Sequence, residues 1–256
     1  MDDIVLVKTV DAEAELDALA RRYARAGNAG IDVLNTIGGQ ADTLIDRLPQ
    51  PVKDRLNDAA QVALTQAVRA AQGSRIVVPD QASWLNTAVN TAMGAAGGFG
   101  GLPTAMAELP VTTTLLLRII QGVADEHGFD PASENVQFDA VQVFAAAGPL
   151  ADDDGADLAF LSTRLGLSGP AMQMLIARVA PRLATVLGQK LAAQTVPILG
   201  AVAGAATNYA YTQYYTEMAH VHFGLRRLAV DADIPHETLV SGLRTRLPEM
   251  RSARKS

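Results

Sequence analysis

The sequence predicts an all-α fold, a single multi-helix domain with two Gly/Ala-rich apolar helical segments at its centre. Hydrophobic residues make up 49% of the chain and aromatic residues only 5%, so Ala, Leu and Val supply most of the apolar surface. This composition favours helix-on-helix packing over a β-sandwich. A chain of 256 residues can bury an extensive core. We predict an N-terminal amphipathic helix within 1–33, a helical domain over 34–247 and a basic, disordered tail over 248–256.

The first part of the chain is divided into helical stretches by Gly and Pro. The first stretch has an apolar face and an acidic outer face, and Gly27 is expected to end it. Pro51 suits the first turn of a helix, and Gly128 suits a helix end. Asp130 and Pro131 suit the N-cap and first turn of the next helix. The expected ranges are 11–26, a weaker pattern over 31–48, then 51–72, 111–127 and 131–147, while 76–78 could pair as a short strand.

The second part of the chain continues the helical pattern. An Asp-rich run over 152–157 precedes a short helix, and helix capping is favoured over calcium binding because the late Glu of an EF-hand is absent. Pro181 lies inside the next long helix and should kink it. The expected ranges are a short helix to about 165, then 170–193, 197–230 and 235–247.

Two long segments are almost free of charge. Between Asp80 and Arg118 the sole charged residue is Glu108, and the segment Leu191–Thr216 has none. Small residues in both segments let backbones approach closely. Neither segment offers a clean apolar run of membrane-spanning length, so burial in the core, contact with a lipid, or shallow insertion are all open. The small residues concerned are Gly94, Gly97, Gly98, Gly100, Gly101, Gly200 and Gly204.

Several classes of function lack their sequence signatures. The net charge of −6 argues against nucleic acid as a partner, and the absence of Cys excludes thiolate chemistry. No P-loop, dinucleotide fingerprint, Gly-x-Ser-x-Gly elbow or His-Glu-x-x-His motif occurs. His220 and His222 point in different directions from a regular helix, so they cannot ligate one ion. We expect no metal and no cofactor, and the opening residues predict a cytoplasmic protein because they do not form a signal peptide.

A set of polar residues within the apolar segments forms the candidate ligand site. Five of them share one face of the helix expected over 197–230, where they could line a headgroup or substrate site, or form a partly exposed face over apolar neighbours. The carboxylate of Glu108, in an otherwise neutral segment, could bind a cation or act as a general base, or it could stabilise the start of the following helix. The candidates are Asn208, Tyr211, Tyr215, His222 and Arg226 on the shared face, together with Glu108 and Arg118; catalytic residues remain unassigned.

Several short stretches occur in an order that resembles the EcsC family of bacterial proteins. The resemblance covers about residues 34–230 through the combination of stretches rather than through any one of them. They are Leu44–Val52, Ala95–Pro103, Leu109–Thr114, Ala124–Asp130, Lys190, Val196–Ala201, Asn208 with Tyr209, and Ala219, Phe223 and Arg227.

The resemblance implies little about chemistry. The family is named after a protein encoded beside an ABC transporter linked to secretion, and it supplies no catalytic residues. It implies a transporter component as a partner and a location at the inner side of the cytoplasmic membrane. The sequence does not determine the oligomeric state.

Two functions therefore follow from the sequence. The favoured one is a membrane-associated accessory protein that binds a lipid or another hydrophobic ligand, with a link to transport or secretion. The alternative is a hydrolase or transferase acting on a lipid-like substrate. That alternative needs Glu108, Arg118, Asn208 and His222 to converge from different parts of the chain.

Overall fold

The structure, a computed structural model, confirms the all-α prediction. Every regular element in the residues that it describes is helical. The described residues are 10–37, 46, 48–77, 109–146, 158, 161, 169–194 and 200–255.

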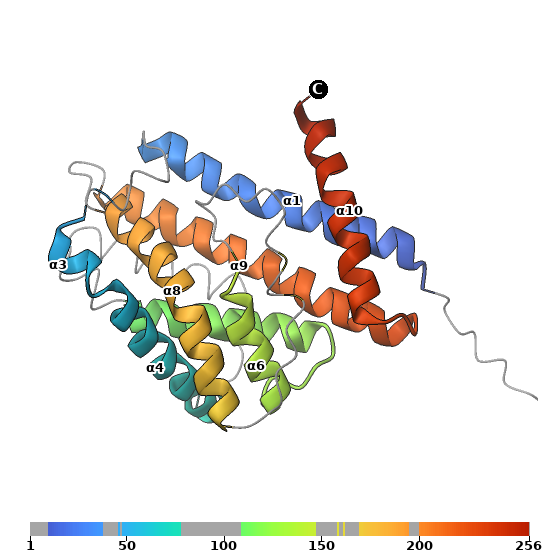
Figure 1. Ribbon diagram of the computed structural model, residues 1–256, viewed down its shortest axis with the longest axis horizontal. Coiled ribbons are helices and arrows are strands. Elements are labelled where there is room, and N and C mark those ends of the chain that lie inside the picture. Colours follow the sequence, from blue (N-terminus) through green and yellow to red (C-terminus); the bar gives the residue numbers. More distant parts are fainter. Residues whose placement is uncertain are drawn as a thin grey trace, which may run out of the picture.

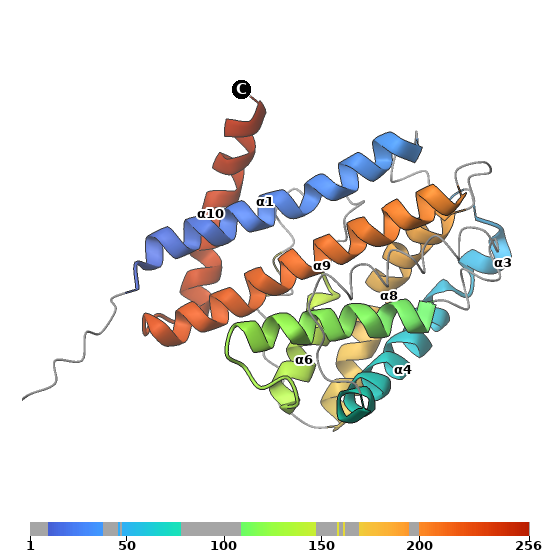
Figure 2. The same ribbon diagram turned by 180° about the vertical axis from the view of Figure 1, so that it is seen from behind.

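The helices pack around one hydrophobic core (Figures 1 and 2). The longest of the described helices is α9. Their apolar faces supply the buried Leu, Ala, Val and aromatic side chains. The elements are α1 (Ala12–Ile37), α3 (Gln50–Lys53), α4 (Leu56–Val77), a helix over 109–126, α6 (Glu134–Val143), α8 (Gly169–Gln194), α9 (Gly200–Asp231) and α10 (His236–Lys255).

Two helix pairs define the arrangement. α1 lies along α9, and α4 packs against α8. The two helices of the first pair are antiparallel, since Leu19 meets Gly224 while Arg22, further along α1, bonds the earlier Glu217 at 3.0 Å. At Gly224 the helices approach so closely that an added Cβ would lie 2.6 Å from a methyl carbon of Leu19. The absence of a side chain at this position therefore leaves room for Leu19 of α1 to lie against the backbone of α9.

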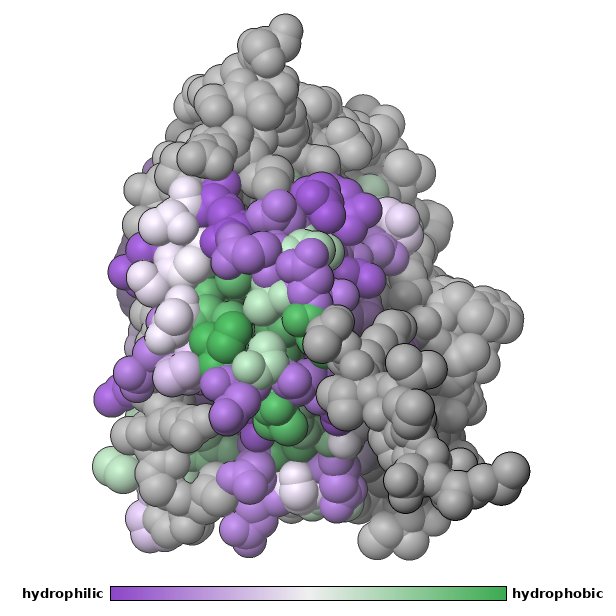
Figure 3. All heavy atoms as spheres, turned by 90° about the vertical axis from the view of Figure 1, so that its right-hand side faces the viewer, coloured by the Kyte–Doolittle hydropathy of each residue, from purple (hydrophilic) through white to green (hydrophobic). Residues whose placement is uncertain are grey.

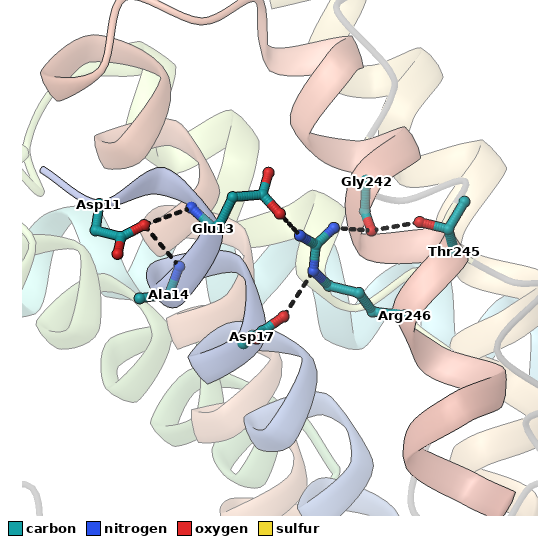
Figure 4. A network of polar contacts seen from close by, with 7 residues as sticks. All are labelled: Asp11, Glu13, Ala14, Asp17, Gly242, Thr245 and Arg246. Atoms are coloured by element: carbon teal, nitrogen blue, oxygen red, sulfur yellow. Dashed lines mark hydrogen bonds and ion pairs between the residues drawn. The ribbon is translucent and has the colours of Figure 1, made fainter.

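The side chain of Arg246 joins α10 to α1 (Figure 4). Its Nε donates to Asp17 Oδ1 at 2.7 Å, and its terminal nitrogens donate to the Glu13 carboxylate and to the Gly242 carbonyl. α10 crosses α1 at this level, and the end of α10 projects away from the other helices (Figure 1). On the face where α9 ends and α10 begins, polar side chains surround a small apolar area (Figure 3).

Several predicted helix ends are wrong. α1 starts as predicted, because Asp11 Oδ1 accepts hydrogen bonds from the backbone of Glu13 and Ala14, but it continues through Gly27 to Ile37. α10 continues to Lys255, beyond the helix end at 247 that we predicted.

The middle of the chain shows three more corrections. Pro51 does lie at the start of a helix, but α3 ends at Lys53 and α4 begins only at Leu56. Ile76 and Val77 belong to α4 and not to a strand. α6 begins after Ser133, whose hydroxyl accepts from the Val136 amide at 3.3 Å, whereas we predicted a start at Asp130. Gly128 has φ 78° at the end of the helix over 109–126, as expected for a glycine helix end.

Candidate functional site

The shared polar face of α9 is buried. Asn208, Tyr211, Tyr215 and His222 are at most 3% exposed, and Arg226 is half-buried. The alternative of a partly exposed face is therefore wrong for the first four residues. These side chains point into the protein because α9 is enclosed by α1 on one side and by α6 and α8 on others.

The face is nevertheless too long to be one site. Asn208 and His222 are fourteen residues apart on α9, a rise of about 21 Å along the helix axis. One headgroup cannot contact both ends, and one reacting atom cannot lie between them. The predicted convergence of Asn208 with His222 therefore does not occur, and the face divides into three local environments.

The middle environment contains the two tyrosines. Tyr211 Oη donates to the carbonyl of Val186 on α8 at 2.8 Å, which fixes α9 against α8. Tyr215 packs edge-on against Phe144 with 5.0 Å between ring centres, and its Oη has no hydrogen-bond partner within the described part of the chain. Burial raises the pKa of Tyr211 and of Tyr215, so both stay neutral.

The environment at the His222 end of the face is an ionic cluster between α9 and α6. Asp139 of α6 accepts a hydrogen bond from Arg226 and lies 3.4 Å from His222 Nε2. The guanidinium of Arg226 also lies over the ring of Phe129, 4.7 Å from its centre. Burial lowers the pKa of His222 to about 4, so this imidazole is neutral near pH 7.

The third environment, at the Asn208 end of the face, contains Lys190 of α8, which we did not include among the candidate residues. This side chain of α8 is 1% exposed, and its Nζ donates to Thr112 Oγ1 at 3.3 Å. Buried polar residues of both long helices surround this end of the α8–α9 pair: Gln189, Thr207, Asn208 and Thr212. A signal was available in the sequence, because Lys190 is the only charged residue between Arg182 and Glu217.

The remaining candidate residues are placed as follows. Arg118 is half-buried on the helix over 109–126. Gly200 and Gly204 lie in the first turns of α9. Glu108 and the glycines at 94, 97, 98, 100 and 101 lie outside the described residues.

A histidine pair occurs where the helix over 109–126 ends beside α9. His127 Nε2 and His220 Nδ1 are 3.1 Å apart, and the rings meet edge-on. Arg22 of α1 and Arg227 of α9 face His127, and Glu126 lies 3.8 Å from His220. Burial, together with nearby positive charge, lowers the pKa of His127 and brings that of His220 to about 4. His220 and His222 thus lie in different environments, as their helical spacing predicted.

We expect the free energy of unfolding to fall as the pH drops from 7 to 5. Above its ordinary pKa of 6.5, His222 is neutral in both states; below it, the unfolded chain binds a proton that the folded protein does not accept until about pH 4. For this fully buried side chain, the loss over that window is about 2 kcal/mol. Urea denaturation at successive pH values measures it, and His222→Asn should make the profile less steep, while His127 and His220, whose pKa values are also lowered, keep their contributions. An unchanged slope in this variant would rule out His222 as the cause.

The described residues form no other recognisable centre. They contain no group of three or more His, Asp or Glu side chains arranged to hold a metal ion. None of the described helices is both long and apolar enough to cross a membrane.

The fold and these environments define an all-α protein with buried charged and polar groups at helix junctions. Residues 39–228, which make up most of the chain, match the EcsC protein family. The protein therefore belongs to that family. The resemblance found in the sequence is thereby confirmed. Neither a curated protein nor a solved structure matches the chain.

Proposed function

We propose that the protein binds a lipid or another hydrophobic ligand where the helix over 109–126, α8 and α9 meet, and that it acts as an accessory protein at a membrane surface. The observation that carries the proposal is the burial of Lys190 beside Thr112 within the core. A buried ammonium is costly even when it is hydrogen-bonded, and apolar side chains of similar volume are often as stable or more stable. Lys190 and Thr112 each make a further polar contact, and we take this buried lysine as the polar group that would orient a ligand.

The surroundings of Lys190 fit an amphiphilic ligand. The apolar core residues Leu187 and Leu191 are next to it on α8, and Leu116 follows Thr112 by one turn on its helix. A ligand at this junction would contact one charged group and an extended apolar surface. That combination is typical of lipid-binding sites, which are mostly apolar with a few polar groups that orient the ligand.

The accessory role draws on the family resemblance. It implies a function beside an ABC transporter, and the ligand would then be a membrane component or a transported amphiphile. We propose a peripheral position on the cytoplasmic side of the membrane. The enzyme alternative has no support from the arrangement of α9, since Asn208 and His222 lie far apart on it.

Native mass spectrometry of the full chain, purified without detergent, tests the proposal. We expect a retained mass of lipid size, its loss after organic extraction, and uptake of lipid when the extracted protein meets vesicles of phosphatidylglycerol and phosphatidylcholine. Circular dichroism before and after extraction controls for unfolding. A folded protein that carries no such mass and takes up nothing from the vesicles would refute lipid binding.

A further inference from the structure

The outer side of α8 presents apolar side chains and an arginine to the surface. Helical spacing places Met174, Arg178 and Pro181 on one side of this helix, where all three are exposed. Met174 is 60% exposed, which is a large fraction for an apolar side chain, whereas Leu175 and Val179 on the other side are buried. The whole of α8 contains three basic residues and no acidic one, although the chain has a net charge of −6.

The neighbouring helix α4 extends this surface. α4 packs against α8, and the two helices lie side by side (Figure 1). Val62, which is 53% exposed, and the exposed Arg69 lie two turns apart on the outer side of α4. Asp58 is the one acidic residue in the sequences of these two helices. We call the surface made by Val62, Arg69, Met174 and Arg178 the α4–α8 face.

Exposed acidic residues gather at a different end of the protein. They lie at the start of α1 and around the turn from α9 to α10, to the right in Figure 1, whereas α4 and α8 lie to the left: Asp11, Glu13, Glu15, Asp231, Asp233 and Glu237. The charge of the protein is therefore distributed unevenly. An anionic surface repels the acidic end and attracts the α4–α8 face, where positive side chains outnumber negative ones.

We propose that the α4–α8 face docks on the anionic headgroups of a membrane, an inference that rests on the proposed function at a membrane surface. Arg69 and Arg178 contact the headgroup phosphates, and Met174 and Val62 insert to a shallow depth between the headgroups. Arginines beside exposed apolar side chains are typical of helices that lie in the interface of a bilayer. The charge complementarity selects anionic lipids over zwitterionic ones.

Sedimentation of the full chain with lipid vesicles tests the inference. Vesicles of phosphatidylcholine alone are compared with vesicles of equal parts phosphatidylcholine and phosphatidylglycerol. We expect binding to the mixed vesicles, little binding to phosphatidylcholine alone, and a loss of binding as the concentration of NaCl rises, because salt screens exposed charges. Each basic side chain near an anionic membrane strengthens binding about fivefold.

Two exposed arginines in different places show which face docks. Arg178→Glu should weaken binding to the mixed vesicles about tenfold or more, and Met174→Ser should weaken it several-fold. The matched control is Arg25→Glu, which changes the net charge by the same amount on α1, a helix that packs against α9 and α10. We expect little effect from this control. Circular dichroism checks that the three variants, all at exposed positions, remain folded.

The outcomes separate this inference from the proposed function. Equal losses for Arg178→Glu and Arg25→Glu, or equal binding to the two kinds of vesicle, would overturn the docking of the α4–α8 face on anionic lipid while leaving membrane association in place. Failure to bind either kind of vesicle would overturn both the docking face and the membrane position. A lipid retained in native mass spectrometry would then still support ligand binding in the core.

Discussion

Replacement of Gly224 by valine should lower the free energy of unfolding by about 1 to 3 kcal/mol, the usual cost of overpacking a well-packed core. The reason is steric, since even a Cβ at this position would lie 2.6 Å from Leu19 Cδ2 and 3.6 Å from His127 Cε1. Leu19 is itself buried, so it has little room to move. Either the Leu19 side chain or α1 as a whole must therefore shift, and chemical denaturation monitored by circular dichroism measures the loss.

Two further variants test whether the clash with Leu19 is the cause. Gly122→Ala places a methyl group in a helix where no atom lies within 4 Å, and it should stabilise the protein by up to about 1 kcal/mol through helix propensity. The double variant Leu19→Ala with Gly224→Val should lose less stability than the sum of the two single variants, because the smaller side chain at position 19 makes room for the valine. If the losses of Leu19→Ala and Gly224→Val simply add, the contact with Leu19 is not what limits residue 224.

The sequence identified the helices better than their ends. Apolar spacing predicted an apolar face for the first helix, and Leu16, Leu19 and Tyr23 on that face of α1 do lie in the core. Its predicted end at Gly27 was wrong because a glycine inside a helix costs only about 1 kcal/mol, which tertiary packing can offset. The start of α6 was misplaced for a related reason. Asp130 does accept a hydrogen bond from the Ala132 amide, but this contact forms a turn before the helix, which is capped by Ser133.

The candidate site was predicted only in part. Helical spacing correctly placed the five polar residues on one face of α9, because that argument depends on a single helix. It could not show that α6 supplies Asp139 to His222 and Arg226, nor that His127 meets His220, because these contacts join helices far apart in the chain. Lys190 could have been chosen by the argument applied to Glu108, since both are lone charges in apolar segments.

Removal of the carboxylate of Asp139 is the second change with a large expected effect. Asp139→Ala leaves the half-buried guanidinium of Arg226 without its counter-ion and removes the neighbour of His222. Loss of one partner of a buried, hydrogen-bonded ion pair costs about 3 kcal/mol, much of it from the charge that remains. Urea denaturation at pH 7 should show this loss, and among the described residues Arg226 keeps its contact with the ring of Phe129 to offset it.

An aspartate on α9 itself provides the matched comparison. Asp231 bonds Arg227 one turn away at 2.7 Å, but that arginine is exposed, so Asp231→Ala should cost no more than about 0.5 kcal/mol. The double variant Asp139→Leu with Arg226→Met should recover much of the stability, because it removes both charges and leaves an apolar contact. Equal, small losses for Asp139→Ala and Asp231→Ala would mean that water compensates Arg226 as fully as Arg227. The cluster between α6 and α9 would then be an ordinary surface ion pair rather than part of the core.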